Sequence, residues 1–121
     1  MKSGKRQDLK TMTKQYALRV IRSYAALPKD SVAQVLGRQL LRSGTSAGAH
    51  YREAQRAKSD ADFINKIEGA LQELEESAYW IELLGDAEVI PAERLAGLLE
   101  ETNELIAICV TITRRTKDRD R

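Results

Sequence analysis

The amino-acid sequence predicts an all-α protein, folded as an antiparallel up-down-up-down bundle of four helices. The first observation is that apolar residues recur at spacings of three and four along most of the chain, as on one face of a helix. The second is composition: only two of the 121 residues are proline, and aliphatic side chains far outnumber aromatic ones. This composition suits helices better than a sheet that needs many turns. A chain of this length is expected to form a single domain, here residues 1–121.

Breaks in the apolar pattern place the helices at 9–26, 32–56, 60–85 and 91–116, between charged tails at 1–8 and 117–121. The segment LPKDS at 27–31 separates the first two helices. Ser59 is the expected N-cap of the third helix, with Asp62 in the capping-box position. Gly85 offers a C-terminal stop, and Pro91 suits the first turn of the fourth helix. Because the connections are short, sequential helices should run antiparallel.

The second helix contains a stretch, SGTSAGA at 43–49, that reads as a loop when taken alone. Its two glycines cost about 2 kcal/mol of helix propensity relative to alanine. The flanking residues favour a helix, because at 100° per residue the arginines fall on one face and the apolar residues on the opposite one. We therefore expect one long helix, straight or kinked at Gly48, whose small residues let a neighbouring helix come close.

The third and fourth helices carry more apolar surface than one bundle needs. Each has a heptad seam, and each has further apolar residues beside that seam. Doubled apolar lines predict a second buried surface and hence a homo-oligomer. The residues expected at the oligomer interface are Phe63, Trp80, Leu99, Ile106 and Val110.

Charge is strongly segregated along the chain. Residues 1–58 hold 13 basic and 3 acidic side chains, whereas residues 59–113 hold 2 basic and 13 acidic ones. In one interpretation the basic and acidic helices neutralise each other within the bundle. In the other, a basic surface remains outside and meets a polyanion.

Four arginines form the clearest basic feature, a stripe about 27 Å long on the second helix if that helix is continuous. Arginine suits phosphate oxygens, so the stripe predicts contact with nucleic acid. The alternatives are a solvated face, or pairing with Glu68, Glu75 and Glu82 of the third helix. The residues of the candidate nucleic-acid site are Arg38, Arg42, Arg52, Arg56 and Lys58, extended by Lys10, Lys14, Arg114 and Arg115.

Catalytic, metal and cofactor sites are not expected. One histidine and one cysteine are too few for a zinc site or a ferritin-like di-metal site. His50 is expected to be packed or to lie at the border of the apolar face. No phosphate loop or nucleophile elbow is present. We therefore expect a protein that is not an enzyme and carries no cofactor.

A polar cluster on the third helix has two interpretations, a site or a set of ion pairs at a helix or subunit contact, of which the ion pairs are favoured. It consists of Lys66, Glu73, Ser77 and Trp80. The lone Cys109 lies in an apolar pattern, as expected of a buried thiol in a reducing compartment. No secretory signal or membrane span is visible, so a cytoplasmic location is expected.

Several motifs together resemble one known family. They are Leu40-Leu41-Arg42-Ser43, the run from Ser46 to Ala54, Ala57-Lys58-Ser59, Asp62-Phe63, Lys66, Ala70-Leu71, and the stretch from Glu73 to Ile81. In combination they are similar to the four helix bundle proteins, first noted as reading frames in intervening sequences of large-subunit ribosomal RNA genes. Relatives include the accessory variability determinant of diversity-generating retroelements. The resemblance covers roughly residues 10–113, and His50 stands where the family usually has asparagine.

The resemblance implies a four-helix bundle that assembles into a homopentameric ring with basic surfaces and a role with nucleic acid. A closed ring needs a heterologous interface, which the doubled apolar lines would supply. Two functions are expected. The first is a non-enzymatic, oligomeric bundle that binds structured RNA or DNA through the arginine stripe. The alternative is a protein-interaction scaffold that recruits a basic partner, such as a polymerase or reverse transcriptase.

Overall fold

The computed structural model describes residues 5–119, with side chains from residue 9 onward, and this part is all-α with four helices and no strand. The outermost residues of the predicted charged tails, 1–4 and 120–121, lie outside the described residues. The all-α, four-helix prediction is thus confirmed. The helices are α1 (Lys5–Ala25), α2 (Ser31–Ala54), α3 (Asp60–Asp86) and α4 (Ala92–Arg119).

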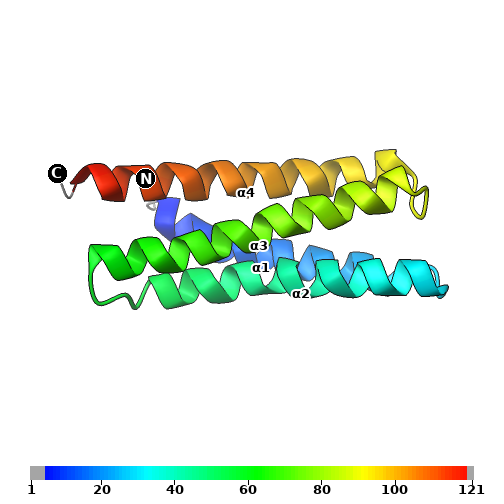
Figure 1. Cartoon of the computed structure of the whole chain (residues 1–121), viewed down its shortest axis with the longest axis horizontal. Coiled ribbons are helices and arrows are strands. Elements are labelled where there is room, and N and C mark those ends of the chain that lie inside the picture. The colour runs from blue at the N-terminus through cyan, green and yellow to red at the C-terminus, as the bar shows by residue number, and fades with distance from the viewer. Residues whose placement is uncertain (1–4, 120–121) are drawn as a thin grey trace.

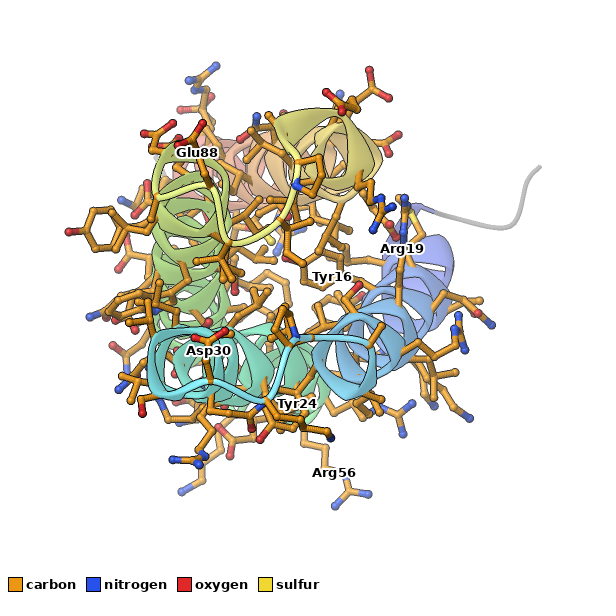
Figure 2. The ribbon with its side chains drawn as sticks, turned by 90° about the vertical axis from the view of Figure 1, so that its right-hand side faces the viewer. Tyr16, Arg19, Tyr24, Asp30, Arg56 and Glu88 are labelled. Atoms are coloured by element: carbon orange, nitrogen blue, oxygen red, sulfur yellow. The ribbon has the colours of Figure 1, made fainter. Side chains whose placement is uncertain are left out.

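The four helices lie side by side, and successive connections are at alternate ends of the molecule (Figure 1). The start of α1, the end of α4 and the α2–α3 connection therefore share one end. Seen along the helices, the four surround a common interior, to which apolar side chains of all of them contribute (Figure 2). Backbone contacts are most extensive between α2 and α3 and least extensive between α1 and α4, while the diagonal pairs, α1 with α3 and α2 with α4, meet only through side chains of the interior.

Two of the helix limits differ from the expected ones at the outer ends of the chain. α1 begins at Lys5 and α4 continues to Arg119, so part of each predicted charged tail is helical. At the α2–α3 connection, α2 ends at Ala54, and Arg56 lies in the following turn. The backbone N–H of Arg56 donates to the carbonyl of Glu53 at 3.0 Å, a tighter turn than an α-helix makes. Helix ends depend on tertiary contacts that periodicity does not report.

The sequence did not indicate how α3 ends before the α3–α4 connection. α3 passes through Gly85 and ends at Asp86. The chain reverses at Glu88, which has a φ of 59°, in the left-handed region where glycine is more usual. Pro91 lies just before α4, and its carbonyl accepts the N–H of Arg94 at 3.0 Å.

Side chains cap α2 and α3 at their N-termini. Ser59 accepts the N–H of Asp62 at 3.1 Å, which confirms the predicted N-cap of α3. The carboxylate of Asp62 accepts from the N–H of Lys58 at 3.2 Å, one residue earlier than in a reciprocal capping box. That hydrogen bond is the main reason that the pKa of Asp62 is lower than its usual value, and the hydrogen bond from Lys66 is the second. Asp30 caps α2 by accepting the N–H of Ala33 at 3.0 Å.

Close approach of α1 to α2 depends on three glycines. α2 is unbroken through residues 43–49, as predicted. Gly37, Gly44 and Gly48 turn the same side toward α1. A Cβ at Gly44 would lie 2.9 Å from a methyl of Val20, and one at Gly48 would lie 3.2 Å from the hydroxyl of Thr13. A side chain at Gly44 would force its neighbour to move, and one at Gly48 would need a smaller shift, so the small residues set the spacing of the two helices.

A layer of four hydroxyl groups, one from each helix, crosses the middle of the core. Its members, called the hydroxyl layer below, are Tyr16, Ser43, Ser77 and Thr102, each with 0% exposure. The Tyr16 hydroxyl lies 2.6 Å from that of Thr102, and the Ser43 hydroxyl lies 2.8 Å from that of Ser77. Figure 2 shows Tyr16 reaching into the middle of the bundle. Buried hydroxyls must be paired, so these contacts favour one alignment of the four helices.

Donor assignments within the layer follow from the backbone. Thr102 and Ser77 donate to the carbonyls one turn back, of Leu98 and Glu73, at 2.8 and 2.9 Å. Tyr16 therefore donates to Thr102, because each hydroxyl has a single hydrogen. Ser43 lies 2.8 Å from the Ser77 hydroxyl and 3.4 Å from the carbonyl of Leu40, so its hydrogen goes to the nearer acceptor, Ser77. Burial raises the pKa of Tyr16, an effect that the hydrogen bonds of neighbouring hydroxyls oppose.

Candidate nucleic-acid interface

Arg42, at the centre of the predicted arginine stripe, is paired with α3. Its guanidinium donates to Glu76 at 2.6 Å and to Glu73 at 3.2 Å. The hydrogen bond to Glu76, followed by the charge of Glu73, raises the pKa of Arg42. Pairing was one of the alternatives from the sequence, but the partners differ from the expected Glu68, Glu75 and Glu82. A half-exposed arginine held in this way is less available to an external anion than a free one.

The remaining cations of the stripe are exposed. Arg38 and Arg52 lie on α2, whereas Arg56 and Lys58 lie beyond its end. Figure 2 shows Arg56 pointing away from the bundle. Within the described part of the chain, none of these four side chains forms an ion pair. The helical stripe therefore ends at Arg52, about 21 Å from Arg38 at 1.5 Å per residue, and continues into the turn.

Two lysines of α1 lie beside the far end of this stripe. Thr13 faces Gly48, and in antiparallel helices this register puts Lys10 roughly level with Arg52. Helical rotation places Lys10 and Lys14 on the outer side of α1 next to α2, and both are exposed. Neither forms an ion pair within residues 9–119. We call the exposed cations of these two helices the α1–α2 basic face: Lys10, Lys14, Arg38 and Arg52.

The basic residues at the end of α4 lie on a third helix. Arg114 and Arg115 are exposed at the same end of the bundle as Lys10, and α4 packs against α1 and α3 rather than against α2. Further along α4, Lys117 pairs with Glu68 at 3.4 Å, and Arg119 pairs with Asp60 at 3.0 Å.

The predicted oligomer-interface residues have different environments. Phe63 is 9% exposed and belongs to the chain's own core, so its burial needs no second subunit. Trp80, Leu99 and Ile106 are partly buried against that core. Val110 lines a groove of about 270 Å³ between α3 and α4. In the described part of the chain, the indole N–H of Trp80 is enclosed without a hydrogen-bond partner.

Exposed apolar side chains that the sequence pattern did not predict are Leu18, Ile21, Val32, Val35 and Tyr79. Leu18 and Ile21, like Val32 and Val35, are three residues apart and so lie on one side of their helix, but two apolar residues are too few to stand out as a pattern. Single exposed apolar residues are common on proteins and do not by themselves mark a site.

His50 lies at the border between α2 and α3. Its ring packs against Gly69, where a Cβ would lie 3.1 Å from Nδ1. The ring nitrogens are 3.7 Å from Glu53 and 3.6 Å from Glu73, and the side chain is 35% exposed. These distances allow ion pairs only when the imidazole is protonated.

The polar cluster expected on α3 is divided among separate contacts. Lys66 bonds Asp62 at 3.2 Å, Glu73 receives Arg42, and Ser77 belongs to the hydroxyl layer. The cluster thus consists of an ion pair within α3, an interhelical pair and a core hydroxyl. Its members do not converge on one cavity.

The α3 surface away from α2 is acidic. Glu68, Glu75 and Glu82 recur every seven residues and are all exposed. Glu75 and Glu82 have no ion pair among the described residues, so their charge is directed to solvent. The two sides of the molecule therefore carry opposite charge.

Over residues 5–119, no group of three or more histidine, cysteine, aspartate or glutamate side chains is arranged to hold a metal ion. In the same part of the chain, no helix combines the length and the apolar character that crossing a membrane requires.

Comparison with known proteins identifies the family. A family model described as 23S rRNA-intervening sequence protein matches residues 5–111. The crystal structure of a protein of unknown function from the S23 ribosomal protein family of Bacteroides thetaiotaomicron superposes with a TM-score of 0.86. The two sequences are 37% identical over 92% of this chain and 99% of that one. No curated protein matches the chain. The chain belongs to the family of 23S rRNA-intervening sequence proteins.

Proposed function

We propose that the protein is a non-enzymatic, oligomeric bundle that binds structured RNA or DNA through the α1–α2 basic face. The observation that carries this proposal is the group of exposed cations on two adjacent helices that form no ion pair among the described residues. The register of α1 and α2 puts Lys10 roughly level with Arg52, with Lys14 one turn further along α1, while the carboxylates of α3 neutralise Arg42. The match to a family described by 23S rRNA intervening sequences supports a nucleic-acid partner.

Such a face suits phosphate contacts without base readout. Lysine and arginine neutralise phosphates and release condensed counterions, which makes the affinity strongly dependent on salt. The face carries no aromatic side chain among its cations, so stacking on single-stranded bases is not expected there. Duplex or folded nucleic acid, with regularly spaced phosphates, is therefore the favoured ligand.

The first prediction concerns the triple variant Lys10→Gln/Lys14→Gln/Arg52→Gln. Its affinity for a structured RNA at about 50 mM salt should fall tenfold or more, and its log–log salt slope should flatten by roughly one for each phosphate that the variant no longer neutralises. Fluorescence anisotropy of nuclease-treated protein at about 50 and 200 mM salt measures both quantities.

The matched control is Arg22→Gln/Lys29→Gln/Arg94→Gln, which removes the same charge from exposed positions outside the face. It should bind nearly as well as the unmodified protein. An equal loss of affinity in the two variants would mean that net charge alone explains the effect. No loss in either variant would overturn the proposed interface.

The oligomer is proposed to be a ring of five, as the family resemblance implies. The partly buried Trp80, Leu99 and Ile106 support a second buried surface, since they keep accessible apolar area in the isolated chain. We expect sedimentation of a species several times the 13.6 kDa chain mass at micromolar concentration. A single 13.6 kDa boundary would contradict the ring.

A second candidate function is the protein-interaction scaffold. The exposed, unpaired Glu75 and Glu82 favour it, because an acidic surface attracts a basic partner such as a polymerase or reverse transcriptase. Co-purification of one defined basic protein that survives nuclease treatment and is absent with Glu75→Gln/Glu82→Gln would support this function over the first.

A further inference from the structure

The end of the bundle that carries the α2–α3 connection contains a pocket of about 400 Å³. Three elements line it: the last turn of α2 with the following connection, the first turn of α3, and the end of α4. Its volume falls within the range of small-molecule sites, which begins at roughly 300 Å³. Most of the lining is polar, so an apolar ligand is not favoured.

The pocket has an apolar side and a charged side. Ala54, Tyr51 and Phe63 form the apolar side and are almost fully buried, so its shape is set by the core. The charged side has two cations from different elements, Lys58 of the connection and Arg119 of α4. A ligand that matches both sides has a flat, partly apolar ring and a negatively charged group.

Arg119 is held in place by a partner. One nitrogen of its guanidinium donates to Asp60 at 3.0 Å. A guanidinium has five N–H donors in a fixed plane, so this bond orients the group and leaves other donors for an anion. The carboxylates beside these two cations are already paired, Asp60 with Arg119 and Asp62 with Lys66, so Lys58 forms no ion pair among the described residues.

The pocket also continues the proposed nucleic-acid interface. Arg52 lies in the last turn of α2 and Arg56 in the turn that follows, and Lys58 both ends that series of cations and lines the pocket. A strand that follows the cations of α2 in this direction reaches the pocket where α2 ends. A strand that ends at this point places its terminal nucleotide at the pocket, within reach of Lys58 and Arg119.

We propose that this pocket binds the terminal nucleotide of a nucleic-acid strand that ends in a phosphate monoester. Lys58 and Arg119 receive the phosphate, and the base lies against Phe63 and Ala54. A terminal monoester carries close to two negative charges at neutral pH, against one for an internal diester, so the two cations distinguish an end from the middle of a strand. This inference rests on the proposed function.

The test uses the full chain and short labelled RNA duplexes, the structured ligand that the proposed function favours, in which one strand differs only at one end. One pair carries a 5′-phosphate or a 5′-hydroxyl with the label at the 3′ end, and a second pair reverses the arrangement. We expect one of the phosphate-bearing forms to bind about tenfold more tightly than its hydroxyl counterpart at about 50 mM salt. The pair that shows the preference identifies which end the pocket takes.

Three single variants assign the preference to the pocket. Lys58→Gln and Arg119→Gln should each remove most of the preference, and circular dichroism checks that these exposed substitutions leave the helices intact. Lys117→Gln is the matched control, because this lysine lies beside the pocket on α4 but pairs with Glu68 and does not line it. It should keep the preference.

Two failures are distinguishable. If all duplexes bind and the salt dependence is steep, but the terminal phosphate makes no difference, the pocket proposal is overturned and the α1–α2 basic face stands. A preference that survives both pocket variants also overturns it. If no duplex binds at either salt concentration, the proposed function itself fails and the pocket proposal fails with it.

Discussion

Replacing Gly44 by valine is expected to lower the free energy of unfolding by about 3 kcal/mol, the upper end of the usual cost of overpacking. Even the first added carbon would lie 2.9 Å from a methyl of Val20, and valine adds two more methyl groups in the same space. Val20 is fully buried and β-branched, so its side chain cannot rotate away cheaply. α1 must then move away from α2. Urea denaturation followed by circular dichroism measures the destabilisation.

Two further variants test this explanation. Gly44→Ala/Val20→Ala should be more stable than the sum of the single effects, because the second change makes the room that the first requires. Gly97→Ala should have the opposite sign and gain roughly 0.5–1 kcal/mol, since this exposed helical glycine faces only the flexible end of Arg19. If the two changes in the double variant have additive effects on the free energy of unfolding, or if Gly97→Ala is destabilised, then close contact with α1 is not the reason that position 44 requires glycine.

Replacing Tyr16 by alanine is expected to cost about 3–5 kcal/mol, as for other large buried side chains. The change removes a fully buried ring and one of the two donors that cross the hydroxyl layer. Tyr16→Phe separates these contributions, because it keeps the ring and removes only the bond to Thr102. It should cost about 1 kcal/mol. Equal destabilisation of the two variants in urea denaturation would mean that the ring packing is unimportant.

The unmodified protein and Tyr16→Phe should also differ in alkaline solution. Burial raises the pKa of Tyr16 in the folded chain, so the unfolded chain, with a tyrosine pKa near 10.0, ionises first. The contribution of the protonated Tyr16 hydroxyl to the stability of the fold is therefore present below about pH 10 and disappears as the pH rises above it. Burial also raises the pKa of Cys109, to about 11, but this thiol is common to both proteins. The stability difference between them should shrink from pH 8 to pH 11, and a constant difference would contradict the account.

The periodicity of apolar residues was sufficient to predict the helices and some of the contacts between them. The continuity of α2 could be predicted because the residues on either side of Gly44 and Gly48 stay in phase. The N-cap at Ser59 could be predicted because capping is local. By contrast, the reversal at Glu88 has no glycine to mark it, and the end of α2 depends on packing around the next turn.

Charge pairing could not be predicted, because it depends on the rotation of one helix against another. Arg42 meets Glu73 and Glu76 because that side of α3 turns toward α2, whereas Glu75 turns to solvent. The hydroxyl layer could not be predicted from the sequence either. Ser43 and Thr102 stand at helical spacing from apolar residues, but a sequence does not show that hydroxyls of four helices meet at one level. The pocket beside Arg119 depends on three segments that are distant in the sequence.

The start of α1 and the end of α4 lie at the same end of the bundle in Figure 1, which has a practical consequence for attaching labels or surfaces. An affinity handle joined ahead of α1 or after α4 would be anchored at the end that holds Lys58 and Arg119, where it could shield the pocket or compete for its cations. The connections near Lys29 and Glu88 lie at the far end. The 27 residues of α3 separate the two ends by about 40 Å. A fluorophore or a biosensor linkage placed at Lys29 would leave the basic end free to face its ligand.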